Sequence, residues 1–110
     1  MADFVQVTTT LPDEETARRV ASCAVDERLA ACAQVLGPIS SIYRWRGEVK
    51  QEQEWYCHLK STGARLAALE ARIRELHPYE VPEIIALPII RGNPRYLEWI
   101  REELTADQER

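Results

Sequence analysis

The sequence predicts an α+β domain in which helices cover one face of an antiparallel sheet. Three observations support this fold class: β-branched segments alternate with segments of helical spacing, the apolar period switches between two and about 3.6, and glycine and proline mark the turns. A chain of 110 residues fits a single core that buries roughly two-thirds of the surface of its unfolded form. We therefore expect one domain over residues 1–110.

The first two elements are expected to be a strand and a helix. Residues 4–10 read FVQVTTT, which is β-branched and aromatic enough for a strand. Leu11-Pro12-Asp13 ends the strand and offers a helix start. The apolar positions of the helix then follow at helical spacing and continue towards Leu29; they are Ala17, Val20, Ala21 and Ala24.

Beyond Gly37-Pro38 the apolar period changes to two, which indicates a β-hairpin turned at Gly47. The first arm begins at Ile39. The second arm, from about Glu48 to Lys60, is roughly twice the usual strand length of about 5–6 residues. We expect unequal arms, so that part of the second arm lacks a partner strand.

A second helix should follow, with Thr62 as its N-cap. Its buried stripe consists of Leu66, Leu69, Ile73 and Leu76. Pro78 ends this helix, because the residue before a proline is pushed out of helical geometry.

The last strand is expected from Val81 to Ile90, at a sheet edge where Pro82 and Pro88 can turn their missing N–H away from any partner. Gly92-Asn93-Pro94 then starts a terminal helix, with Asn as cap and Pro in the first helical position. The buried stripe of that helix is Tyr96, Leu97, Ile100 and Leu104.

This order of elements is a ferredoxin-like βαββαβ sandwich with an additional C-terminal helix. The unpaired part of the second hairpin arm would be satisfied by strand addition between copies of the chain, which predicts a closed homo-oligomer. The alternative is a twisted hairpin that stays partly exposed.

Charge and composition exclude several classes of partner. A net charge of -4, with scattered basic residues, argues against nucleic acid. No apolar run approaches the ~20 residues that span a membrane, and MADFVQV lacks the features of a signal peptide, so we expect a soluble cytoplasmic protein. Cys23, Cys32 and Cys57 have no C-x-x-C spacing, which suits a reducing compartment without disulfides.

Several segments in series resemble the CutA divalent-cation tolerance family. They are LAACAQV (29–35), SSIYRWRGEVKQEQEWYCHLKST (40–62), HPYEVPE (77–83), ALPI (86–89) and YLEWI (96–100). The resemblance implies a ferredoxin-like subunit, a compact homotrimer similar in build to PII-type signalling proteins, and an association with copper and other divalent metals.

The resemblance implies a metal site, but this chain has fewer of the ligands found in some family members. Some bacterial members have a cysteine at the end of the first strand and paired histidines before Pro-Tyr, where this chain has Thr9 and Leu76-His77. The remaining candidate ligands are His77, with Glu83 or Cys32 near a subunit boundary, for weakly bound copper or zinc. Selective sites typically need three or four ligands. The structural alternatives are a histidine that caps its helix and a cysteine that packs as a small core residue.

A ligand site is implied at the trimer seam. It would join Tyr43, Trp45, Glu54, Lys60 and Tyr79 with Glu83 in a concave pocket of mixed polar and aromatic lining. The alternatives are packed aromatic residues and ordinary solvent-facing charges on strands. Pro78 and Pro82 would hold the segment that enters the last strand stiffly beside a neighbouring subunit.

The predicted function is a non-enzymatic homotrimer that binds metal ions or a small ligand in metal tolerance. An enzyme is the rival class, but the chain has only two histidines, His58 and His77. Cys57 and His58 should face opposite sides of a strand, so they cannot form a catalytic dyad. The further alternatives are a PII-like small-molecule sensor and a trimeric scaffold for a partner protein without a metal role.

Overall fold

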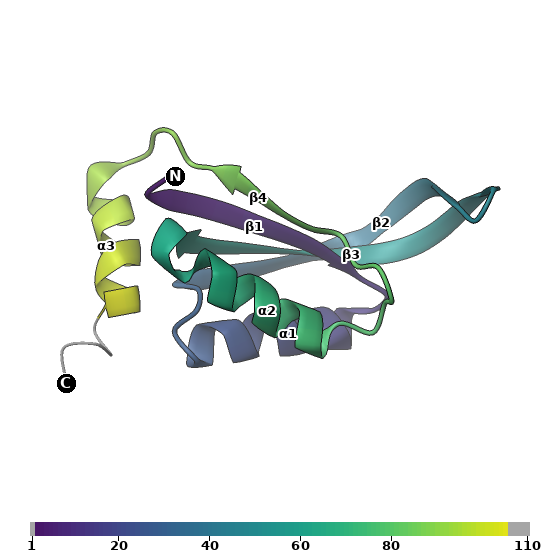
Figure 1. The fold of residues 1–110 in the computed structure, drawn as a ribbon, viewed down its shortest axis with the longest axis horizontal. Helices are drawn as coiled ribbons and strands as arrows, with labels where there is room; N and C mark the ends of the chain where they lie inside the picture. Colours follow the sequence, from purple (N-terminus) through teal and green to yellow (C-terminus); the bar gives the residue numbers. More distant parts are fainter. Residues whose placement is uncertain (1, 106–110) are drawn as a thin grey trace.

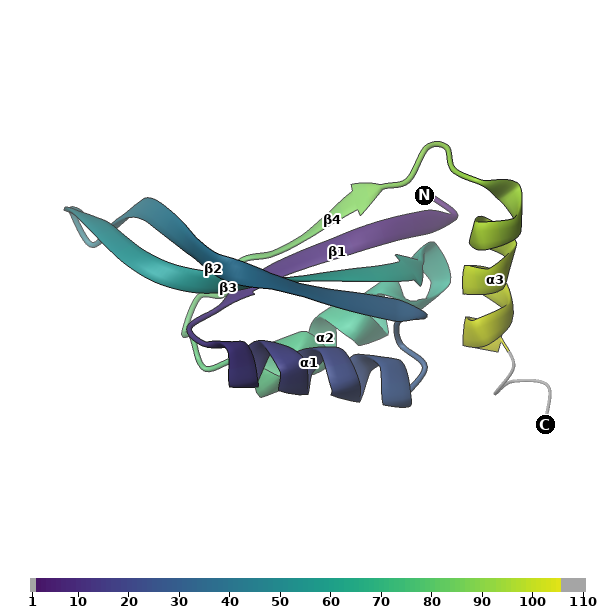
Figure 2. The ribbon, with the colours of Figure 1, turned by 180° about the vertical axis from the view of Figure 1, so that it is seen from behind.

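A computed structural model describes residues 2–105, so residues 1 and 106–110 of the expected domain lie outside the described part. Its elements are β1 (Phe4–Leu11), α1 (Glu14–Asp26), β2 (Cys32–Trp45), β3 (Glu48–Thr62), a 3-10 turn (Gly63–Arg65), α2 (Leu66–Leu76), β4 (Ile84–Pro88) and α3 (Pro94–Thr105). The strands form one antiparallel sheet in the order β2-β3-β1-β4. Helices α1 and α2 lie together on one face, and α3 crosses the end of the sheet (Figures 1 and 2). The predicted α+β class is confirmed.

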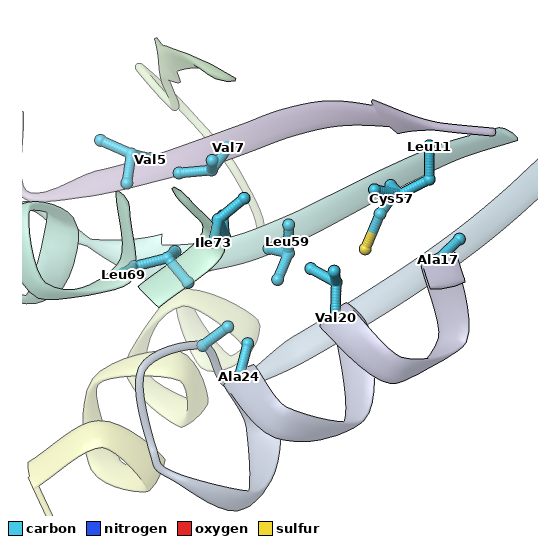
Figure 3. Close-up of a cluster of buried hydrophobic side chains, with 11 residues drawn as sticks. Val5, Val7, Leu11, Ala17, Val20, Ala24, Cys57, Leu59, Leu69 and Ile73 are labelled. Carbon is cyan, nitrogen blue, oxygen red and sulfur yellow. The ribbon is translucent and has the colours of Figure 1, made fainter. Parts of the chain in front are cut away.

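The core lies between the sheet and its two covering helices. Alternate residues of β1 and β3, among them Val7 and Leu59, point to the helices and are fully buried. Figure 3 shows Val20 of α1 and Ile73 of α2 directed at this face. The apolar spacings of two in the strands and three to four in the helices therefore meet in one cluster.

The helix starts follow the sequence signals in two of three cases. Asp13 accepts a hydrogen bond from the Thr16 N–H at 2.7 Å at the start of α1, and Asn93 accepts one from the Arg95 N–H at 3.1 Å at the start of α3. The prediction for Thr62 is wrong. Its side chain makes no capping bond, because the 3-10 turn separates it from α2.

The hairpin differs from the prediction, because its arms are nearly equal. Strand β2 begins at Cys32, and the ladder with β3 runs from Cys32–Lys60 to Trp45–Glu48, with one irregularity between Leu36 and Ile39. As an edge strand, β2 passes through Pro38 at this irregularity without losing an essential bond. No overhang of the second arm is left to drive association.

A different part of the hairpin lacks partners. Strand β1 pairs with β3 only as far as Leu11–Trp55, so residues 39–54 continue as a two-stranded ribbon beyond the body of the sheet. We call this ribbon the hairpin arm; Figure 1 shows it projecting from the end of the sheet opposite α3. It carries exposed apolar side chains, including Ile42 at 68% and Val49 at 62% of full exposure.

The last strand is an edge strand as predicted but is shorter, Ile84–Pro88 instead of residues 81–90. Pro82 therefore precedes the strand, and only Pro88 belongs to it. Residues 77–83, which we call the 77–83 loop, run from the end of α2 to β4. None of the helices described between residues 2 and 105 is long and apolar enough to cross a membrane.

Candidate functional site

A hollow of about 1040 Å³ opens between the hairpin arm and the 77–83 loop, where β1 ends and the arm begins to project. Its described lining consists of Thr10, Ile39, Ser40, Ser41, Ile42, Tyr43, Trp45, Glu54, Tyr56, Pro78, Tyr79, Glu80, Val81, Pro82 and Glu83. The structure thus brings together Tyr43, Trp45, Glu54, Tyr79 and Glu83, five of the residues predicted from the sequence.

Glu54 and Tyr79 form the polar centre of the hollow. Glu54 is only 7% exposed, and its Oε2 accepts a hydrogen bond of 2.8 Å from the Tyr79 hydroxyl. Burial, followed by the hydrogen bond to Glu54, raises the pKa of Tyr79 above its ordinary value. The tyrosine therefore stays neutral and serves as a donor to the buried carboxylate.

His77 sits behind the hollow as the C-cap of α2, 9% exposed. Its Nε2 lies 2.8 Å from the Thr10 carbonyl oxygen and 3.1 Å from Thr9 Oγ1, and its Nδ1 accepts from the Tyr79 N–H at 3.2 Å. This pattern places the proton on Nε2. Burial lowers the pKa of His77, although the Thr10 bond and the Glu54 charge oppose this effect. Both ring nitrogens are engaged, so this arrangement leaves no lone pair for a metal ion.

The lining of the hollow is acidic. Of the described residues that form it, Glu54, Glu80 and Glu83 carry carboxylates and none is a lysine or arginine. Partial burial, followed by the charge of Glu54, raises the pKa of Glu83. Because the Glu83 residue as a whole is solvent-exposed, this electrostatic interaction contributes little to stability.

Aromatic side chains form the arm side of the hollow. The Tyr43 hydroxyl donates to the Glu52 carboxylate. The Arg46 guanidinium, from the tip of the hairpin, lies 5.2 Å from the Trp45 ring centroid and 3.3 Å from the Glu80 carboxylate. Arg46 thereby connects the hairpin arm to the 77–83 loop at the mouth of the hollow.

Two predicted site residues lie elsewhere. Cys32 and Lys60 are cross-strand partners, and Lys60 in turn pairs with Gln6 of β1. His77 contacts Thr9 and Thr10, three or four residues further along that strand, which is about 10 Å or more at a rise of about 3.3 Å per residue. One chain therefore does not bring Cys32 to His77.

The surroundings of Cys32 and Lys60 are also distinct from the hollow. The Cys32 Sγ lies 3.6 Å from the Tyr96 hydroxyl of α3, and Cys32 is only partly buried. The Lys60 ammonium donates to the Gln34 side-chain carbonyl. Lys60 is not among the described residues that line the hollow.

Within residues 2–105 no group of three or more His, Cys, Asp or Glu side chains is placed to hold a metal ion. The predicted separation of Cys57 and His58 is confirmed: the Cys57 thiol is buried in the core, which raises its pKa to about 12. The His58 Nδ1 lies 3.0 Å from the Thr8 hydroxyl. These two side chains cannot act together as nucleophile and base.

Sequence reasoning missed several residues in the lining of the hollow and beside it. Tyr56 shares a strand face with Glu54 by simple alternation, so the period of two could have found it. Arg46 and Glu80 had no local signal, because their pairing depends on how the hairpin arm and the 77–83 loop approach each other.

Known proteins match nearly the whole chain. The family model described as CutA1 divalent ion tolerance protein matches residues 5–103. The divalent-cation tolerance protein CutA of Thermus thermophilus is 50% identical over 93 residues, which cover 84% of this chain and 90% of that protein. Protein CutA of Mus musculus is 41% identical over 93 residues that cover 84% of this chain and 52% of the relative, so the chain spans about half of its length.

Solved structures share the fold. The crystal structure of CutA from Xylella fastidiosa superposes with a TM-score of 0.90 at 37% identity, covering 94% of this chain and 99% of that one. The structure from Thermus thermophilus gives a TM-score of 0.89 at 48% identity, covering 91% and 97%. With a family match over residues 5–103, the chain belongs to the CutA1 divalent ion tolerance protein family.

Proposed function

We propose that the chain acts in divalent-cation tolerance as a non-enzymatic homotrimer that binds a cation or small ligand in the hollow between the hairpin arm and the 77–83 loop. The observation that carries this proposal is the convergence of five predicted side chains on one acidic hollow whose described lining contains no basic residue. A cation in the hollow would offset the mutual repulsion of Glu54 and Glu83.

The hairpin arm supports the homotrimer. A two-stranded ribbon is marginally stable by itself in water, and the arm carries the exposed side chains Ile42 and Val49 next to Tyr43 and Trp45. Packing the arm against a sister chain would bury these apolar groups and pair its free edges. The hollow would then lie near a subunit boundary.

Copper or zinc would be held weakly under this proposal. Glu54 and Glu83 supply two carboxylates, while the nitrogens of His77 are already hydrogen-bonded and Cys32 lies at another part of the sheet. A tetrahedral site would need further donors, which a sister chain or water could provide.

Two measurements test the proposed function. Sedimentation at micromolar concentration should report a mass three times 12.7 kDa, and a single 12.7 kDa species would contradict the trimer.

Calorimetric titration with Zn(II) and Cu(II) should show binding that weakens in Glu83→Gln. Glu70→Gln removes a carboxylate that is paired with Arg74 on α2, away from the hollow, and is the matched control. Equal affinities in both variants would remove the hollow as the metal site.

A small-molecule sensor is the second candidate, favoured by the size of the hollow. Ligand pockets commonly measure about 300–1,000 Å³, and the hollow has about 1040 Å³. Thermal-shift screening of neutral, anionic and cationic small molecules should raise the melting temperature for a true ligand. The absence of any shift in the trimer would favour a scaffold role instead.

A further inference from the structure

We propose that the ligand of the hollow is a small organic cation that carries an ammonium group, and that Glu54 together with the aromatic side chains of the hairpin arm recognises it. This inference rests on the proposed function, since it uses the same hollow. It goes further by naming the chemical class of the ligand. The argument has three steps: the charge of the lining, its aromatic character, and the size of the space.

The charge of the hollow selects a cation over an anion or a neutral molecule. Among its described lining residues, Glu54, Glu80 and Glu83 carry carboxylates and none is a lysine or arginine; Arg46, outside that lining, pairs with Glu80 alone of the three. Glu54 is more than nine-tenths buried, and the Tyr79 hydroxyl holds one of its oxygens at 2.8 Å. The carboxylates of the lining would repel a phosphate-bearing ligand, and no lysine or arginine of the described lining would offset that repulsion.

The aromatic character of the hollow favours an organic cation. Tyr43, Trp45, Tyr56 and Tyr79 all line it, and aromatic faces attract ammonium and guanidinium groups within about 6 Å of the ring centroid. The protein itself provides an example at the mouth. The Arg46 guanidinium lies 5.2 Å from the Trp45 ring and 3.3 Å from Glu80, so one aromatic ring and one carboxylate already hold an organic cation.

The size and donors of the hollow disfavour a bare metal ion as its main occupant. In the single chain this space of about 1040 Å³ is far larger than one ion with its ligands. No group of three or more metal-binding side chains occurs within residues 2–105. A hydrated divalent ion would also have to exchange water for an aromatic wall, whereas a methylated ammonium is weakly hydrated and gains from that contact.

Calorimetric titration with choline tests this inference, because choline has a neutral isostere, 3,3-dimethylbutan-1-ol, of nearly the same shape. We expect choline to bind the trimer and the isostere to bind at least roughly tenfold more weakly. Glu54→Gln and Trp45→Leu should each weaken choline binding roughly tenfold. Glu70→Gln, which removes an exposed carboxylate of α2, should leave the affinity unchanged.

The outcomes separate the two proposals. Equal binding of choline and the isostere would overturn the inference, since it would show an apolar site. Zinc binding that depends on Glu83, with no binding of choline or of a primary-amine probe such as putrescine, would overturn the inference and leave the proposed function standing. If neither amines nor metal ions bind the folded trimer, both proposals fail. Circular dichroism of each variant confirms that a loss of binding is not a loss of fold.

Discussion

Removing the Tyr79 hydroxyl should cost much more stability than the same change at Tyr43. In Tyr79→Phe the buried Glu54 carboxylate, 7% exposed, loses a hydrogen-bond donor at 2.8 Å. Hydrogen bonds to charged groups contribute about 1.5–3 kcal/mol, so we expect the free energy of unfolding to fall by about that amount. Tyr43 also donates to a glutamate, Glu52, but both side chains are exposed, so Tyr43→Phe should cost about 0.5 kcal/mol or less.

Urea unfolding of both variants at one fixed protein concentration measures this difference, since the proposed trimer would make stability concentration-dependent. In a Glu54→Gln background, Tyr79→Phe should cost at least about 1 kcal/mol less than in the parent. Additive effects of the two substitutions, or equal costs at Tyr79 and Tyr43, would refute the reasoning.

The pH dependence of the Tyr79 contribution follows from its raised pKa. Burial and the bond to Glu54 favour the neutral hydroxyl in the folded state. The stabilisation is therefore fully present below the unfolded value of about 10 and is lost as the pH rises through the folded pKa. The difference between the parent and Tyr79→Phe should shrink in alkaline solution.

Three further predictions concern other parts of the fold. Burial lowers the pKa of His77, so the stabilising effect of this residue is present above about pH 6.5 and is lost as the pH falls. In urea unfolding, His77→Gln should therefore lose less stability than the parent between pH 7 and pH 5. An equal dependence of the unfolding free energy on pH in both proteins would contradict this. Burial raises the pKa of the Cys57 thiol to about 12, so Cys57 should react with a thiol reagent more slowly than Cys23 and Cys32. Its reaction rate should rise when urea unfolds the protein. A fast reaction of Cys57 in the folded protein would show that its thiol is not buried. The Arg65 side chain donates a hydrogen bond of 2.5 Å to the Leu104 carbonyl oxygen in the last turn of α3. Arg65→Ala should lower the free energy of unfolding by about 1–2 kcal/mol and increase the rate of amide exchange in α3. Unaltered amide exchange would show that Arg65 does not cap this helix.

The elements with local signals could be predicted from the sequence. The caps at Asp13 and Asn93 and the end of α2 before Pro78 are decided by a few adjacent residues, and the structure has them where expected. The start of β2 was not predicted correctly, because the strand begins at Cys32 and not at Ile39. Gly37-Pro38 indicates a break by itself, yet the strand continues through it because it lies at the sheet edge, a fact that depends on the order of all four strands.

The site could be predicted in composition but not in geometry. The sequence predicts that Tyr43, Glu54 and Tyr79 meet at a seam between subunits, and in the structure a single chain already brings them together. The cause is the length of β1, which ends at Leu11 and leaves its place beside β3 to the 77–83 loop. The role of His77 depended on its two hydrogen-bonded nitrogens, which no spacing pattern reveals.

The irregularity of β2 at Gly37 gives the hairpin arm a fixed starting direction. A methyl group on that residue would come within 2.6 Å of the Trp55 ring, so the backbone and the indole are in direct contact where the ribbon leaves the body. The contact at its base thus sets the direction of the arm, while Arg46 near its far end pairs with Glu80 of the 77–83 loop. A ligand bound between the arm and the 77–83 loop would add a further connection between them, and its binding would restrict the position of the arm relative to the loop.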